Sequence, residues 1–319
     1  MEVGRRTALA LPWLCAAPAF AQGGRPARLI VPFPAGGTTD LLARLTTDRL
    51  AARLGHPVVV ENRAGAAGGV AAAEAARGDA DGSTLFLASI GTAATNPLVY
   101  RHLPYRTEDL AEVAALFALP NVATVAPRAP FPDLAGFIAA AREKPGALSF
   151  GSSGAGSSLH LTGEMLKHRA GIDLLHVPYR GGGQMLTELL AGRIDIAFGN
   201  LPTAIGMIRD GTLRALAVTG PRRNPALPDI PTVAEAANLS GFAATVWFGL
   251  QVPRATPAPV VERLNEAAQA MLAEPAVRAR LAELGVEPMG GSPADFSRFV
   301  QDEAAAWRPV ITGAGISVE

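Results

Sequence analysis

The stretch Leu29-Ile30-Val31-Pro32-Phe33-Pro34-Ala35-Gly36-Gly37-Thr38-Thr39-Asp40 reads as a strand, a glycine-rich turn and the start of a helix. A second stretch, Leu148-Ser149-Phe150-Gly151-Ser152-Ser153-Gly154-Ala155-Gly156-Ser157-Ser158-Leu159-His160, repeats this order farther along the chain. Each loop sets backbone N–H groups, hydroxyls and the positive end of a helix dipole at one point, which favours an anion. The sequence therefore predicts two loops that can hold a small anion between them.

Short apolar runs alternate with helical stretches from residue 28 onward, a pattern typical of parallel strands with helices on both faces. We expect strands at 29–31, 57–60 and 84–88, with helices at 41–54 and 70–77 between them. The pattern restarts after the apolar run 113–125, which Pro120 and Asn121 interrupt. A second α/β unit is therefore expected.

The proline-rich segment 220–231 can form neither a central strand nor a helix, and it suits a return of the chain to the first unit. We therefore expect an α/β protein of two lobes, with lobe 1 formed by residues 22–121 and 221–319 and lobe 2 by residues 122–220. Because one lobe is inserted in the other, two crossings near 119–122 and 219–221 are expected to act as hinges beside a ligand cleft.

Residues 1–21 have the pattern of an export signal: Arg5 and Arg6, an apolar run, and Ala19-Phe20-Ala21 as a cleavage site. Cys15, the only cysteine, would leave with this signal peptide, and a mature chain without disulfides fits a bacterial periplasm. Basic and acidic residues number 28 each, with no run of like charge, which argues against nucleic acid as a partner. No later stretch is apolar and long enough to cross a membrane.

Eight short motifs, spread over nearly the whole mature chain, carry a resemblance to a known family. They are VPFPAGG (31–37), VVVENRAG (58–65), DGSTL (81–85), GSSG (151–154), HVPYRG (176–181), NLP (200–202), LRALAVT (213–219) and LPDIPT (227–232). In this order they resemble the Bug-type periplasmic solute receptors of tripartite tricarboxylate transporters. The resemblance implies a type II periplasmic binding protein fold, in which two α/β lobes close on a small organic carboxylate. It also implies transient contact with a membrane permease, and a ligand carboxylate held by loop backbone groups and ordered waters.

The candidate ligand-binding residues come from the turns that follow the expected strands. Gly36 and Gly37 allow close backbone approach, and Thr38 or Thr39 can cap the next helix. Phe33 can line the cleft or pack inside, and His160 can line the cleft or occupy an interior site. Arg180 is a candidate for a distal ligand group, and Asn200 for a hydrogen bond. The full set is Phe33, Pro34, Ala35, Gly36, Gly37, Thr38, Ser89, Thr92, Ser152, Ser153, Gly154, Ala155, Gly156, Ser157, His160, Arg180 and Asn200.

Other functions fit the sequence less well, and we expect a receptor that is not an enzyme and needs no cofactor. A serine hydrolase using Ser153 or Ser157 with His160 lacks the G-x-S-x-G elbow. Neither loop has G-x-G-x-x-G spacing for a dinucleotide, and the five histidines show no paired spacing for zinc, so no metal is expected. We therefore expect a periplasmic monomer that serves a transporter or, alternatively, presents its ligand to a membrane sensor. Gly199 replaces an acidic residue of many relatives, which favours a plain carboxylate over an amino acid.

Overall fold

The computed structural model describes residues 25–318, so the expected signal peptide lies outside the described residues. Ten strands form one mixed sheet in the order β2-β1-β3-β9-β4-β7-β5-β6, and β8 and β10 also pair with β4. The strands are β1 (Ala27–Val31), β2 (Val58–Asn62), β3 (Thr84–Ser89), β4 (Leu110–Val125), β5 (Ser149–Ser152), β6 (Leu175–Pro178), β7 (Ile196–Asn200), β8 (Arg214–Val218), β9 (Thr245–Pro253) and β10 (Glu287–Pro288).

The longest strand, β4, joins two halves of this sheet. Residues Leu110 to Pro120 of β4 pair with β9, whereas Asn121 to Val125 pair with β7 and β8. We call β2, β1, β3, β9 and β10 with the first part of β4 sheet I, and β6, β5, β7 and β8 with the last part of β4 sheet II. Within the halves β1 is parallel to β2 and β3, and β5 is parallel to β6 and β7, as the alternating pattern predicted.

The apolar run around Pro120 is therefore one continuous strand, not the interrupted segment that the sequence indicated. Proline has no N–H to donate to a neighbouring strand, and for that reason it is rare in central strands. In β4 it occupies the last position opposite β9, immediately before the partner strand changes to β7. The N–H group that proline lacks would therefore stand at the residue where β4 changes its pairing partner from β9 to β7.

The second expected crossing lies against the first. The Thr219 N–H donates to the Asn121 carbonyl oxygen at 2.9 Å, and the Ala244 N–H donates to the Thr219 carbonyl oxygen at 2.8 Å. Between these positions the chain contacts sheet I through the Arg222–Glu287 ion pair and then pairs with β8 at Thr232. The exact lobe boundaries stay a prediction.

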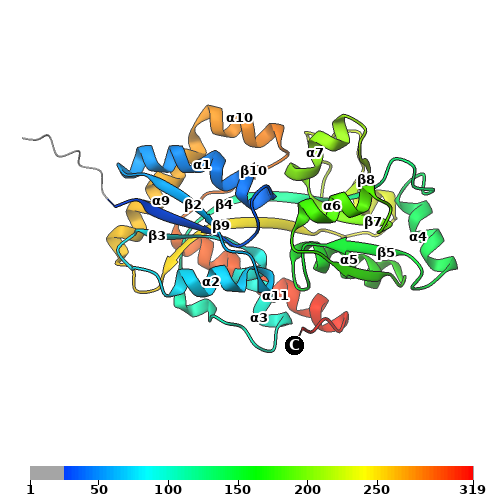
Figure 1. Ribbon diagram of the computed structural model, residues 1–319, viewed down its shortest axis with the longest axis horizontal. Coiled ribbons are helices and arrows are strands. Elements are labelled where there is room, and N and C mark those ends of the chain that lie inside the picture. Colours follow the sequence, from blue (N-terminus) through cyan, green and yellow to red (C-terminus); the bar gives the residue numbers. More distant parts are fainter. Residues whose placement is uncertain (1–24, 319) are drawn as a thin grey trace, which may run out of the picture.

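Helices cover both faces of the sheet, as Figure 1 shows. Beside sheet I, α1 and α10 lie above the strands in this view, and α2, α3 and α11 lie below them. The helices are α1 (Thr38–Leu54), α2 (Gly69–Ala76), α3 (Asn96–Val99), α4 (Leu134–Glu143), α5 (Ser158–Ala170), α6 (Gly182–Leu190), α7 (Leu201–Arg209), α8 (Val233–Ala236), α9 (Ala258–Ala273), α10 (Pro275–Glu283) and α11 (Pro293–Gly313), with short helical turns η1 (Ala66–Gly68), η2 (Gly91–Thr95) and η3 (Thr107–Asp109).

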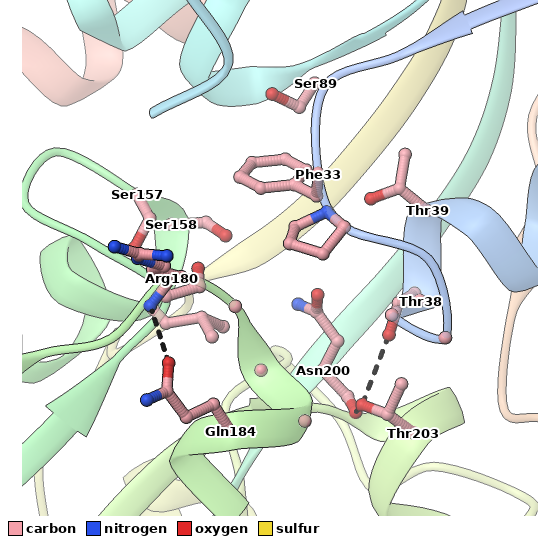
Figure 2. A pocket seen from close by; sticks show the side chains of 18 of the residues that line it. Phe33, Thr38, Thr39, Ser89, Ser157, Ser158, Arg180, Gln184, Asn200 and Thr203 are labelled. Carbon is pink, nitrogen blue, oxygen red and sulfur yellow. Dashed lines mark hydrogen bonds between the residues drawn. The ribbon is translucent and has the colours of Figure 1, made fainter. Parts of the chain in front are cut away.

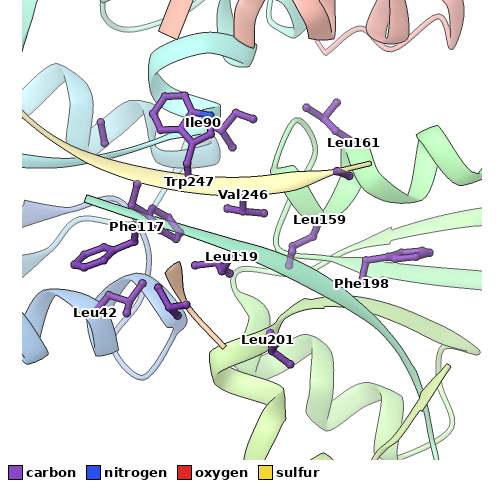
Figure 3. Close-up of a cluster of buried hydrophobic side chains, with 14 of the residues drawn as sticks. Leu42, Ile90, Phe117, Leu119, Leu159, Leu161, Phe198, Leu201, Val246 and Trp247 are labelled. Atoms are coloured by element: carbon purple, nitrogen blue, oxygen red, sulfur yellow. The ribbon is translucent and has the colours of Figure 1, made fainter. Parts of the chain in front are cut away.

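One continuous apolar core follows β4 and β9 through both halves (Figure 3). Phe117 and Trp247 are buried in sheet I, and Phe198 is buried in sheet II. The Trp247 ring meets Phe296 of α11 edge-on at 5.7 Å, and its indole N–H donates to Glu303 at 2.9 Å. Because large buried rings resist displacement, this core fixes the loops at the carboxyl ends of β1, β5, β6 and β7.

Candidate functional site

A cavity of about 600 Å³ lies where loops of sheet I meet loops of sheet II. Its walls come from the β1–α1, β3–η2, β5–α5, β6–α6 and β7–α7 connections and from Phe248 of β9 (Figure 2). The carboxyl ends of strands are where open α/β folds bind ligands, and the volume is in the range of small-molecule sites. The fold thus places the two glycine-rich loops of the sequence around one cavity.

The β1–α1 loop is held open toward the cavity by contacts behind it. Gly36 has a φ of +80°, and its N–H donates to Asp40 Oδ2 at 3.0 Å. Burial opposes ionisation of Asp40, but hydrogen bonds from Arg44 and Gly36 outweigh it and keep the pKa of this carboxyl below its ordinary value. The cap of α1 is Gly37, so Thr38 and Thr39 are helical residues and do not cap the helix, contrary to the sequence-based expectation.

The β5–α5 loop is anchored by side chains that point away from the cavity. Ser152 is fully buried, and its hydroxyl lies 2.7 Å from His176 Nε2. Gly154 and Gly156 both have positive φ, +122° and +78°, as the sharp loop requires. Ser157 caps α5 by accepting the His160 N–H at 3.3 Å. The loop therefore presents Ser153, Ser157 and Ser158 to the cavity.

His160 and His176 form a buried stack beneath this loop, with ring centroids 4.0 Å apart. Burial lowers the pKa of His160 to about 3 and that of His176 to about 4, so both imidazoles are neutral at pH 7. His160 Nδ1 accepts the Gly156 N–H at 3.1 Å, and its Nε2 faces Glu164 at 3.8 Å. Neither ring nitrogen of His160 bonds to Ser153 or Ser157 in the described chain, so the hydrolase alternative has no Ser–His pair at the cavity.

The remaining walls are hydrogen-bonded to neighbouring elements. Ser89 lines the cavity, whereas Thr92 lies behind it and accepts the Ser89 N–H at 2.9 Å. The Asn200 amide donates to Asn121 Oδ1 at 2.6 Å, which connects the cavity to the crossing in β4. The Thr203 hydroxyl donates to the Asn200 carbonyl oxygen at 2.9 Å.

Elements of the two halves touch one another around the cavity. The hydroxyls of Thr38 and Thr203 lie 3.3 Å apart, a contact that Figure 2 marks. Tyr100 directly follows α3. Its hydroxyl donates to the carbonyl oxygen of Ala155, on the β5–α5 loop, at 2.6 Å. These two contacts join sheet I elements to sheet II elements at separate points of the rim.

Eleven of the predicted residues line the cavity, and six lie behind its wall. The lining residues are Phe33, Pro34, Ala35, Gly36, Gly37, Thr38, Ser89, Ser153, Ser157, Arg180 and Asn200. The other six are Thr92, Ser152, Gly154, Ala155, Gly156 and His160, which support the lining loops. Ligand contact by any of these residues stays a prediction.

The predicted set omits several residues that line the cavity. They are Thr39, Ala67, Gly91, Ser158, Leu159, Gly181, Gly182, Gly183, Gln184, Thr187, Thr203 and Phe248. The glycine run after Arg180 was a visible signal, since it follows a strand as the two quoted loops do. Phe248 had no local signal, because it lies within a strand and reaches the cavity only through the sheet order.

The electrostatics of the cavity favour an anion. The N-termini of α1, α5, α6 and α7 all lie in its lining, and three of these four helices have no side-chain cap. Among the described residues that line the cavity, Arg180 is the one charged side chain. Helix N-termini carry partial positive charge and unsatisfied N–H groups, which suit a carboxylate.

The model of the family described as "Tripartite tricarboxylate transporter family receptor" (TctC) matches residues 42–316. The chain belongs to this family. Among curated relatives, a protein encoded in the tcbD–tcbE intergenic region of Pseudomonas sp. is 38% identical over 90% of this chain and 85% of that protein. BugT of Bordetella pertussis is 34% identical over 92% of this chain and 91% of its own.

Solved structures agree with this assignment. An R. palustris protein solved with adipate is 39% identical, with a TM-score of 0.89 over 92% of this chain and 98% of that chain. MatC from Rhodopseudomonas palustris with bound malate is 32% identical, with a TM-score of 0.85 over 90% and 98% of the two chains. BugD, a periplasmic binding protein, is 30% identical with a TM-score of 0.87 over 92% and 99%.

These similarities confirm the type II periplasmic binding protein fold and the Bug-type receptor family. TctC receptors are periplasmic solute-binding proteins and not enzymes, which confirms the expectation that this chain has no catalytic role. Within residues 25–318 no helix combines the length and apolar character of a membrane span. The same part of the chain has no cluster of three or more potential metal ligands.

Gly199 of β7 lies against α6. A Cβ on Gly199 would lie 3.7 Å from the side chains of Met185 and Leu186, and Gly199 is not part of the cavity wall. The preference for a plain carboxylate over an amino acid stays a prediction.

Proposed function

We propose that this receptor captures a small organic carboxylate in the cavity and delivers it unchanged to the permease of a tripartite tricarboxylate transporter. The observation that carries the proposal is the convergence of four helix N-termini on a cavity whose described lining has no acidic side chain. A carboxylate gains hydrogen bonds and favourable charge there, whereas an ammonium group meets no partner. The relatives solved with adipate and malate support the same ligand class.

Binding is tested by calorimetry on residues 22–319 with mono-, di- and tricarboxylates, aromatic acids, amino acids and the neutral amide of each acid. We expect certain acids to bind and to be recovered intact, and their amides not to bind. Ser153→Asp places a negative charge in the cavity wall and should weaken binding by about tenfold or more, because like charges repel in a poorly solvated site. Ser317→Asp is the matched control, because Ser317 is exposed and is not part of the cavity wall. This variant should bind the acid as the unmodified protein does.

The outcome that contradicts the proposal is binding of an amide as tight as binding of its acid, or equal loss in both aspartate variants. Delivery is a separate question, tested by uptake of the identified acid in cells that lack the permease and in cells that lack this receptor. Normal uptake with a lost transcriptional response in cells without the receptor would instead favour presentation of the ligand to a membrane sensor. N-terminal sequencing of the periplasmic protein and its mass in solution test cleavage after Ala21 and the monomeric state.

A further inference from the structure

Arg180 is a charged side chain at a site that is already suited to an anion without it. It extends from the β6–α6 loop, its side chain is exposed, and its backbone N–H donates to Gln184 Oε1 at 3.3 Å. In the described chain no carboxylate lies within 4.0 Å of its guanidinium group. Arg180 thus differs from the many arginines of the described residues that do form ion pairs. Its positive charge is therefore available to a ligand.

Figure 2 shows two polar sides of the cavity, separated by Phe33 and Asn200. Arg180 lies with Ser157 and Ser158 on one side, and Thr38 and Thr39 lie on the other. A ligand with a single carboxylate can occupy only one of these sides at a time. A ligand with an anionic group at each end can use both, with its apolar middle against the Phe33 ring.

Gly182 and Gly183, which follow Gly181 in the same loop as Arg180, have no structural reason to be glycine. Gly182 and Gly183 begin α6 without a positive φ, and a Cβ at either would meet nothing within 4 Å. Glycine lowers helix stability relative to alanine, so a side chain at these positions would help the fold. Both residues line the cavity. Their lack of side chains leaves open space and bare backbone in the cavity that Arg180 also lines.

We infer that the ligand carries two separated anionic groups, that Arg180 binds the second of them, and that Gly182 and Gly183 keep the space for it. This inference rests on the proposed function and narrows its ligand class to elongated dicarboxylates. An arginine binds a carboxylate through two parallel N–H···O bonds, which a neutral side chain of similar length does not reproduce. Arg180 and the two glycines would then determine specificity, while the β1–α1 loop holds the first carboxylate.

The test measures the affinity of linear dicarboxylates from succinate to suberate, each beside the monocarboxylate of the same chain length. We expect at least one dicarboxylate to bind about tenfold more tightly than its monocarboxylate partner. Arg180→Gln should remove this preference by weakening the dicarboxylate about tenfold more than its monocarboxylate partner. Arg128→Gln, at an exposed position outside the cavity, is the matched control and should retain the preference.

Gly183→Leu should have the same selective effect, because its side chain would fill space in the cavity that Arg180 also lines. Its control is Gly206→Leu, since Gly206 is an exposed helical glycine outside the cavity whose Cβ would also meet nothing within 4 Å. We expect both leucine variants to melt at or above the temperature of the unmodified protein, and only Gly183→Leu to lose the dicarboxylate preference.

The results separate the two claims. Monocarboxylates and dicarboxylates that bind equally well, or a preference that survives Arg180→Gln, overturn the inference and leave the proposed function intact. If none of these acids and no other acid of the screen binds, the proposed function fails and the inference fails with it. Equal losses for both acids in Gly183→Leu would show a general disturbance of the cavity and contradict the assignment of the glycines.

Discussion

Replacing Tyr100 by phenylalanine tests whether contact between the two halves contributes to ligand affinity. The change removes the hydroxyl that donates to the Ala155 carbonyl oxygen at 2.6 Å and leaves the ring in place. Ala155 belongs to the loop that presents Ser153 and Ser157 to the cavity, so the hydrogen bond joins sheet I to a ligand loop of sheet II. The bond is present in the arrangement described here, and we expect it to break when the two halves open.

The expected size follows from the net value of one neutral hydrogen bond, about 1 kcal/mol. If the bond exists only in the closed form, its loss raises Kd by about fivefold and leaves the melting temperature of the ligand-free protein almost unchanged. The assay is calorimetry with the tightest acid of the ligand screen, paired with melting of the ligand-free protein. Stopped-flow fluorescence should place most of the change in the dissociation rate.

Tyr105→Phe is the matched control. The Tyr105 hydroxyl is buried and donates to the Thr92 carbonyl oxygen at 2.8 Å, within the same half of the protein. Its loss should lower the free energy of unfolding by about 1 kcal/mol and leave Kd unchanged. An unchanged Kd in Tyr100→Phe, or equal Kd changes in both variants, would refute the idea that this contact is specific to the closed form.

Three further predictions concern stability. Because His160 and His176 have pKa values of about 3 and 4 in the fold, well below the ordinary value of 6.5, the unfolded chain binds protons first as pH falls. The free energy of unfolding should therefore decrease from pH 6.5 toward pH 4 and depend less on pH in His176→Gln, as urea titrations would show. Gly163→Ala, whose Cβ would lie 2.2 Å from a ring carbon of Phe150, should cost about 1–3 kcal/mol in thermal melts. Asn121→Ala, which leaves buried polar partners unsatisfied, should cost about 1–3 kcal/mol by urea titration and also raise Kd.

Much of the fold was predictable because strand and helix periodicity are local properties. The strands at 29–31 and 84–88 and the helix at 41–54 were expected within a few residues of their observed bounds. The continuity of β4 was not, because Pro120 is a strand breaker when considered alone. Only the change of pairing partner at that position, a long-range property, makes proline acceptable there.

The candidate site was predictable where single loops supply it and not where distant segments meet. The two glycine-rich stretches do line the cavity, because each combines a strand end with a helix start. The hydrolase alternative, which the sequence disfavoured, paired Ser153 or Ser157 with His160. The structure instead pairs Ser152 with His176 of the neighbouring strand β6. Such a pairing depends on strand register, and no spacing within one segment reveals it.

The sheet order also determines when each half of the protein can be completed as the chain is synthesised. Every strand of sheet II precedes Thr219, so these strands can pair as soon as they emerge. Sheet I must wait, because β9 starts at Thr245 and has to enter between β3 and the first part of β4. Until then both strands have an open edge, which exposes backbone groups to other chains. A truncated chain that ends before β9 would therefore be prone to aggregation, and the final third of the sequence is needed to close the half that the first residues begin.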